Sequence, residues 1–118
     1  MKRIIVVGIN PSCVTKSISL KRLYSWMDDV GVNTFSFVNC IGRPGNYTLK
    51  DVEYDLLEEC TKNYTKVIAL GNFPSSALDK INVSHYKLPH PSGLNRKLND
   101  KHYELSMLKD LRNYLNEH

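Results

Sequence analysis

The stretch KRIIVVGINPS, Lys2–Ser12, decides the fold class, because an apolar run of β-branched residues breaks at once into turn-forming residues. The run Lys2–Gly8 predicts a short strand that is buried on both faces, as in a parallel sheet. Asn10 and Pro11 follow directly, and both residue types favour turns. A polar loop is therefore expected at the carboxyl end of the first strand.

Outward from this stretch, strands and helices alternate along the chain. The expected helices are Ser19–Val30, with a Ser19 cap and Gly31 after its end, a helix opened by Thr48 with Val52, Leu56 and Cys60 on one face, a short helix around Ser75–Lys80, and Asp100–Glu117 with Leu105, Leu108, Leu111 and Leu115 on one face. The further strands are Thr34–Asn39, Lys66–Gly71 and His85–Leu88. This alternation predicts a small three-layer α/β fold with a four-stranded, mainly parallel sheet flanked by helices.

Length and composition predict one domain, residues 1–118, with the composition of an ordinary soluble globule: 42% hydrophobic and 24% charged residues. The three cysteines have no paired C-x-x-C spacing, which argues against a zinc site or a redox couple and favours a reducing compartment. No signal peptide and no apolar run of membrane-spanning length are visible, so we expect a cytoplasmic, monomeric protein. The net charge of +4 favours a polyanionic partner.

The conspicuous loops all follow strands: INPSC, NCIGRPGN, GNFPS and PHPSGLNR come after the first, second, third and fourth strands. In an open parallel sheet, ligands bind outside the carboxyl ends of the strands. The four polar loops are therefore expected to meet at one rim and to form one site.

These loops carry a resemblance to a known family. GINPS after the first strand, FVNC at the end of the second, KVIALGNFPSSAL and HPSGLNR after the last strand resemble the motifs of the uracil-DNA glycosylase superfamily, in their order along the chain. The resemblance covers nearly the whole chain. It implies a uracil-DNA glycosylase-like fold and cleavage of the N-glycosidic bond of a pyrimidine flipped out of DNA.

Cleavage of that bond leaves a sugar with oxocarbenium character and a base that departs as an anion. The resemblance makes Asn10 and His90 the catalytic residues, Asn10 holding the attacking water and His90 donating to the carbonyl oxygen that gathers charge. Asn39 carries a donor and an acceptor that match the O4 and N3–H edge of uracil or thymine. The expected substrate-binding residues are Gly8, Ile9, Pro11, Ser12 and Asn39.

The HPSGLNR segment resembles the part of the family that enters the minor groove, with Leu94 as the wedge that fills the gap left by the flipped nucleotide. Basic residues lie on or beside the rim loops, including Lys16 and Lys101, where a DNA backbone would run. The expected DNA-binding residues are Arg43, Ser92, Gly93, Leu94, Asn95, Arg96 and Lys97.

The chain departs from the family pattern in ways that leave the substrate open. Ser12 stands where uracil-strict members have a bulky Tyr, so the pocket could admit thymine or a 5-substituted pyrimidine. The loop that usually supplies the ring stacked on the base is missing. Phe35, Phe37 or Tyr24 could substitute for it, although the two phenylalanines are also candidates for the sheet core. The cysteines do not match an iron–sulfur set, so no metal or cofactor is expected.

Taken singly, these residues also have structural interpretations: Asn10 as a turn former, His90 as a loop histidine bonded to backbone, and Asn39 as a cap of its strand. The hypotheses that follow are a monofunctional DNA glycosylase acting in base-excision DNA repair and, alternatively, a reduced family member that binds DNA, a nucleotide or a base without cleavage. The first hypothesis makes the protein a hydrolase. Whether the DNA must be single- or double-stranded is open, and the short chain makes a phage origin conceivable.

Overall fold

The computed structural model describes residues 3–9, 18–42, 47–89 and 100–117. The chain forms two compact units, one of Met1–Cys13 with Thr34–Pro89 and one of Val14–Asn33 with His90–His118. The first unit contains the whole sheet and is described first.

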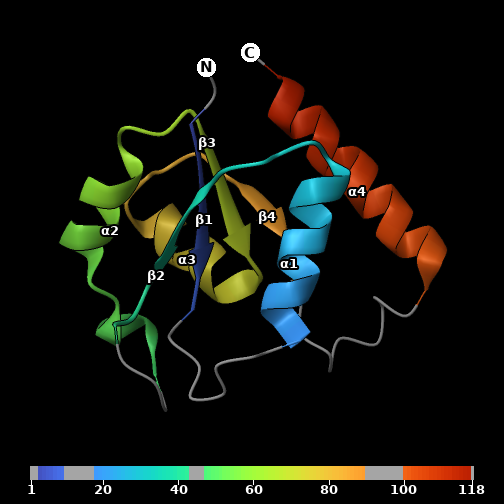
Figure 1. Cartoon of the computed structure of the whole chain (residues 1–118). Helices are drawn as coiled ribbons and strands as arrows, with labels where there is room; N and C mark the ends of the chain where they lie inside the picture. The colour runs from blue at the N-terminus through green and yellow to red at the C-terminus, as the bar shows by residue number, and fades with distance from the viewer. Residues whose placement is uncertain (1–2, 10–17, 43–46, 90–99, 118) are drawn as a thin grey trace. The chain divides into compact units, whose positions relative to one another are not determined.

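The sheet has four strands, β1 (Ile4–Gly8), β2 (Ser36–Asn39), β3 (Lys66–Leu70) and β4 (Tyr86–Leu88). All of the pairings are parallel, and the strand order is β2-β1-β3-β4 (Figure 1). The α/β class and the four-stranded sheet predicted from the alternating pattern are thus confirmed, and the sheet is parallel throughout.

The strand order places a topological switch point at the centre of the sheet. From β1 the chain adds β2 on one side, and from β2 it returns past β1 to add β3 and β4 on the other side. In sheets of this kind, the crevice for a ligand opens where the order reverses, outside the carboxyl ends of the strands. Here that place is the end of β1, between β2 and β3.

One face of the sheet is covered by two helices of the same unit, α2 (Tyr54–Thr61) and α3 (Asn72–Lys80). The shared core contains Ile5 and Val7 of β1, Val67 and Ala69 of β3, Leu57 of α2, and Ala77 and Leu78 of α3. On the other face, Val6 and Ile68 have no exposed surface. Both central strands are therefore buried on both faces, as the unbroken run of β-branched residues predicts.

The strand β2 is an edge strand, and its two faces differ. Val38 packs against the core shared with α2 and α3, whereas Phe37, which points to the opposite face, is 43% exposed. The interpretation of Phe37 as a residue of the sheet core is therefore wrong. An edge strand has a neighbour on only one side, so its side chains keep more contact with water.

The helix predicted from Thr48 begins later than expected. Thr48 caps a single 3₁₀ turn, η1 (Leu49–Asp51), and α2 starts only at Tyr54. The buried face of α2 carries Leu57 and Thr61, and Leu56 is 53% exposed. The prediction that Leu56 lies on the buried face is therefore wrong, and Leu57 takes its place. Val52 lies before α2 and not within it, so the helical spacing counted from Val52 does not apply.

The helix α3 starts three residues earlier than predicted. It begins at Asn72, and Pro74 lies in its first turn. The first four N–H groups of a helix have no partner within the helix, so a proline there removes no hydrogen bond. Gly71, with a φ of 93°, makes the sharp change of direction from β3 into α3.

The second unit contains α1 (Ile18–Asp29) and α4 (Lys101–Asn116). The guanidinium of Arg112 donates to the carbonyl oxygen of Asp29 at 3.1 Å and so links α4 to the end of α1. The buried face of α4 carries Met107, Leu108, Leu111 and Leu115. Leu105, predicted to share that face, is 64% exposed and so lies off it. Within the described ranges, no helix has the length and apolar character that crossing a membrane requires.

Candidate functional site

At the carboxyl edge of the sheet, the segments that follow β1 and β2 remain joined by backbone hydrogen bonds. The amide of Cys40 donates to the carbonyl oxygen of Gly8 at 3.0 Å, and the amide of Ile41 donates to that of Ile9 at 2.9 Å. The register of β1 and β2 pairs Gly8 with Asn39. The backbone is thus held by hydrogen bonds for one residue beyond β1, Ile9, and for two residues beyond β2, Cys40 and Ile41.

Three residues meet at this edge on the face opposite α2 and α3. A Cβ atom built on Gly8 would lie 2.7 Å from Cζ of Phe37 and 2.8 Å from Oδ1 of Asn39. Real Cβ atoms do not approach other atoms so closely, so only glycine leaves room for both side chains. The ring of Phe37 and the carboxamide of Asn39 therefore both lean over the end of β1. We call Gly8, Phe37 and Asn39 the Gly8 cluster.

Asn39 is half-buried, and no described residue makes a hydrogen bond with its carboxamide. An amide that is fixed at a strand end offers one acceptor and two donors in a plane. This geometry suits a planar ligand that presents an N–H group next to a C=O group.

The ring of Phe37 lies on the same face of β2 as the amide of Asn39. This ring is partly exposed and lies over Gly8, two residues before Asn39 on the same face of β2. An exposed aromatic ring is a stacking surface for a nucleobase. Of the three aromatic residues considered from the sequence, the structure places Phe37 next to Asn39.

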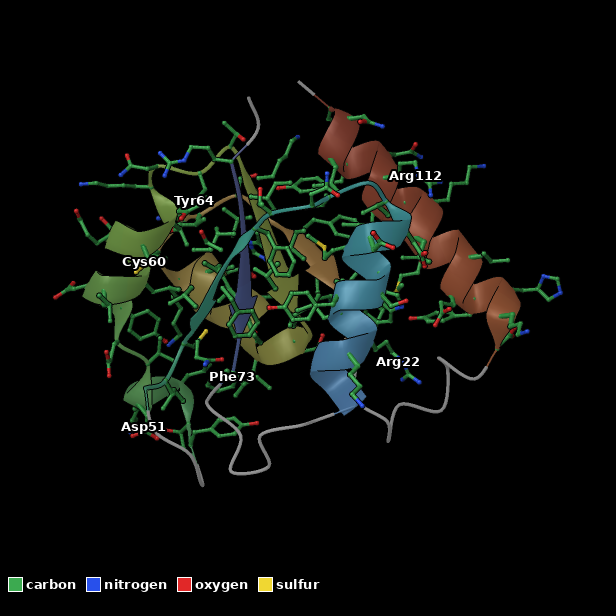
Figure 2. The ribbon with its side chains drawn as sticks, viewed as in Figure 1. Arg22, Asp51, Cys60, Tyr64, Phe73 and Arg112 are labelled. Atoms are coloured by element: carbon green, nitrogen blue, oxygen red, sulfur yellow. The ribbon has the colours of Figure 1, made fainter. Side chains whose placement is uncertain are left out.

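A second aromatic group lies at the same edge of the sheet, on the side of α3. The rings of Tyr47 and Phe73 pack edge to face, with centroids 4.7 Å apart and an angle of 74° between their planes. Figure 2 labels Phe73 below the carboxyl ends of the strands, at the start of α3. Tyr47 is 38% exposed. Phe73 belongs to the GNFPS loop that the sequence singles out, but no motif relates it to Tyr47.

The residues after Tyr47 form a rigid turn. The amide of Thr48 donates to the carboxylate of Asp51 at 2.8 Å, and the amide of Lys50 donates to the hydroxyl of Thr48 at 3.3 Å. This reciprocal capping box fixes the direction in which the chain enters η1. Tyr47 is thus held by its own turn and by the edge of Phe73.

The thiol of Cys40 and the phenol of Tyr54 near this edge are protonated at neutral pH. Burial raises the pKa of the Cys40 thiol from 9.0 to about 11. Burial also raises the pKa of the Tyr54 hydroxyl, and the nearby Cys40 adds to that shift. Cys40 packs in the core below α2 and α3, so it is a small apolar residue of the core rather than a nucleophile.

A serine–histidine pair lies away from the carboxyl edge. The hydroxyl of Ser75 lies 2.7 Å from Nε2 of His85, whose Nδ1 lies 2.8 Å from the carbonyl oxygen of Val83. Since a carbonyl only accepts, Nδ1 donates to Val83, and in the neutral imidazole Nε2 accepts from Ser75. His85 immediately precedes β4, so the pair lies at the amino end of that strand, and it joins α3 to β4.

Of the predicted site residues, the structure describes Gly8, Ile9 and Asn39, and it brings the first and last of these together. Asn10, Pro11, Ser12, Lys16, Arg43, His90, Ser92, Gly93, Leu94, Asn95, Arg96 and Lys97 lie outside the described residues. Lys101, the first residue of α4, is exposed. Among the residues that the structure describes, no three His, Cys, Asp or Glu side chains gather in a way that could hold a metal ion.

Comparisons with known proteins add no relative. Neither the protein-family models, nor the curated proteins, nor the solved structures contain a match to this chain.

Proposed function

We propose that the protein is a monofunctional DNA glycosylase that hydrolyses the N-glycosidic bond of uracil or a C5-modified pyrimidine flipped out of DNA. The observation that carries this proposal is the Gly8 cluster, in which a carboxamide and an aromatic ring lean together over the end of β1. Uracil and thymine are planar and carry an N3–H group beside the O4 carbonyl. They fit an amide that binds their edge and a ring that binds their face.

The place of the cluster also supports a ligand site. Gly8 and Asn39 end β1 and β2, and the switch point of the sheet lies at the end of β1. The sequence continues from there directly into Asn10. A residue that follows the cluster by two positions is suitably placed along the chain to orient a water molecule beside the sugar of a bound nucleotide.

The proposed chemistry assigns separate tasks to separate loops. Asn39 binds the edge of the base and stabilises the negative charge that develops as the base departs. His90, in the loop that follows β4, donates a second hydrogen bond to the base, and Asn10 orients the water that attacks C1′ of the sugar. Bond cleavage that largely precedes attack needs no strong base, which agrees with an amide in that place.

The test is excision of the base from synthetic oligonucleotides. Single- and double-stranded oligonucleotides that contain uracil, a thymine mismatch or 5-hydroxymethyluracil are incubated with the protein and then treated with alkali, which breaks the strand at abasic sites. Hypoxanthine presents the same N–H and C=O edge on a larger base, and it measures the discrimination against purines. We expect strand breaks with at least one pyrimidine substrate.

Variants separate recognition from catalysis. Asn39→Leu removes the hydrogen bonds at nearly constant volume and should weaken binding of a target oligonucleotide about 5- to 150-fold, because a bidentate pair contributes roughly 1–3 kcal/mol. Asn33→Leu makes the same change at an exposed position before β2 and should have no effect. Asn10→Ala and His90→Ala should lower the rate of excision by orders of magnitude and leave binding nearly intact.

The assay also decides between cleavage and binding alone. If the protein retards the oligonucleotides on a gel but produces no strand break with any base, the enzyme proposal fails and a binding module remains. If Asn39→Leu and Asn33→Leu bind equally well, the Gly8 cluster is not the site of recognition.

A further inference from the structure

The aromatic pair Tyr47–Phe73 is not used by the function proposed above. Tyr47 lies in the loop after β2, and Phe73 lies in the first turn of α3, after β3. Because β1 lies between β2 and β3 in the sheet, the contact between these two rings spans the carboxyl end of β1. It does so on the side of α2 and α3, since Phe73 packs against the core on that face.

The end of β1 therefore has aromatic rings on both sides. Phe37 leans over Gly8 on the face away from α3, and the Tyr47–Phe73 pair lies on the face towards it. Both Phe37 and Tyr47 keep more than a third of their surface exposed, at 43% and 38%. Two exposed rings at one strand end are more than one flipped base needs.

The way in which Tyr47 is held favours a binding role over simple packing. The capping box of Thr48 and Asp51 fixes the backbone that follows it, and the edge-to-face contact with Phe73 fixes its ring. No described residue makes a hydrogen bond with its hydroxyl. A ring that is fixed beforehand loses little conformational freedom when a ligand stacks on it.

Two lysines lie near the pair, and the carboxylate of Asp51 in the same turn is bound to the amide of Thr48. Lys50 is exposed on the turn that follows Tyr47. The ammonium of Lys87 reaches the start of α3, where it donates to the side chain of Asn72 at 3.0 Å. Cations next to an exposed ring are the combination by which proteins bind a single strand, with the ring on a base and the cations on the phosphates.

We propose that Tyr47, held by Phe73, stacks the base of an unpaired nucleotide that neighbours the target nucleotide. The proposal rests on the function proposed above, because the target nucleotide is the one held at the Gly8 cluster. A base that stacks on Tyr47 cannot at the same time stack and pair within a duplex.

The experiment measures whether the contribution of the neighbouring base to the binding affinity depends on the ring of Tyr47. The probe is a single-stranded, fluorescein-labelled oligonucleotide with 2′-fluoro-2′-deoxyuridine as target. The electron-withdrawing fluorine destabilises the positive charge that develops on the sugar during cleavage, so the probe stays intact while its binding is measured. Each neighbouring position in turn carries either a normal base or a tetrahydrofuran residue without a base. Affinities are measured by fluorescence anisotropy for the wild type, Tyr47→Leu and Tyr47→Phe.

In the wild type, removal of the base at one neighbouring position should weaken binding roughly 5- to 150-fold, as expected for one stacked base. In Tyr47→Leu, which keeps an apolar contact with Phe73 but has no ring, removal of that base should change the affinity less than 2-fold. Tyr47→Phe should behave as the wild type does. Leu56→Ala, which removes an exposed apolar side chain of α2, serves as the control and should keep the full effect.

Equal losses in the wild type and in Tyr47→Leu at both neighbouring positions would overturn the proposal. So would an affinity of the wild type that the removal of either neighbouring base leaves unchanged. These outcomes are distinct from a failure of the glycosylase proposal, which shows as an absence of strand breaks with every substrate while the binding measurement still reports on Tyr47.

Discussion

Gly8→Ala tests the Gly8 cluster more directly than any change to the polar residues. The added methyl group would lie 2.7 Å from Cζ of Phe37 and 2.8 Å from Oδ1 of Asn39. Carbon atoms in contact prefer separations of roughly 3.5–4.0 Å, so the ring has to move by about 1 Å. The carboxamide has to move by a similar amount. Both groups that we propose to bind the base are therefore displaced by one methyl group.

The cost in stability should be small because two effects oppose each other. Overpacking costs about 1–3 kcal/mol, and the low end applies because the ring of Phe37 is partly exposed and free to turn outward. Gly8 has the extended backbone of β1, which alanine also adopts, so the substitution gains about 0.4–1 kcal/mol by restricting the unfolded chain. The net loss should lie between about 0 and 2 kcal/mol. Activity, by contrast, should fall about 100-fold, since a displacement of about 1 Å has that effect on a positioned substrate.

Gly31→Ala is the matched control. At Gly8 a methyl group is crowded by neighbouring side chains, whereas at Gly31 only the backbone conformation disfavours it. Gly31 has a φ of 83°, and a Cβ atom there would meet nothing within 4 Å. Alanine in that conformation costs about 1–2 kcal/mol, but it disturbs no other residue. Urea unfolding followed by the fluorescence of Trp26, which is 1% exposed, measures the stability of both variants, and strand cleavage measures activity. Wild-type activity in Gly8→Ala would refute the crowding argument, as would a loss of more than about 4 kcal/mol of stability.

Two further predictions concern residues outside the site. Ser75→Ala should cost about 1–3 kcal/mol in urea unfolding, because His85, whose side chain is 8% exposed, loses the donor to its Nε2; the exposed neighbour Ser76→Ala should cost much less, and equal costs would contradict the pairing. Burial raises the pKa of the Cys40 thiol from 9.0 to about 11, because the folded protein favours the protonated form. The part of the free energy of unfolding that depends on this protonated thiol is present in full below pH 9, and it is lost as the pH rises through 11. Iodoacetamide at pH 9 should accordingly label native Cys40 far more slowly than the half-buried Cys60, as measured by mass spectrometry of the peptides, and equal labelling would contradict the burial.

The elements of the sheet could be predicted because their signals are local. A run of β-branched residues that ends in glycine or asparagine marks β1 and β3, and the alternation with helices fixes the parallel class. The faces of two helices were harder to predict. Leu56 and Leu105 fit the apolar spacing by eye, yet both are exposed. In α2 the cause is local: the separate turn that Thr48 caps shifts where the helical phase starts.

The site could be predicted only in part, for a physical reason. The prediction of Asn39 rests on the resemblance of FVNC to a family motif at a strand end, and the structure places this residue over Gly8. The position of Phe37 over the end of β1 depends on the absence of a side chain at Gly8. Gly8 lies in the neighbouring strand, and no pattern in the sequence links these two residues. The pairing of Tyr47 with Phe73 joins residues from two loops that meet only because β2 and β3 flank β1. Such contacts follow from strand order rather than from any pattern within one segment.

The strand order also explains why residues of separate segments meet at the end of β1. In the order β2-β1-β3-β4, the segments after β2 and β3 both border the end of β1. Asn39, the last residue of β2, reaches it from one side, and Phe73, the third residue after β3, lies at the same edge on the other side. A glycine as the last residue of β1 leaves that space open, and any larger residue would close it. The fold thus depends on the apolar run of β1, and the site depends on the one residue of that strand that has no side chain.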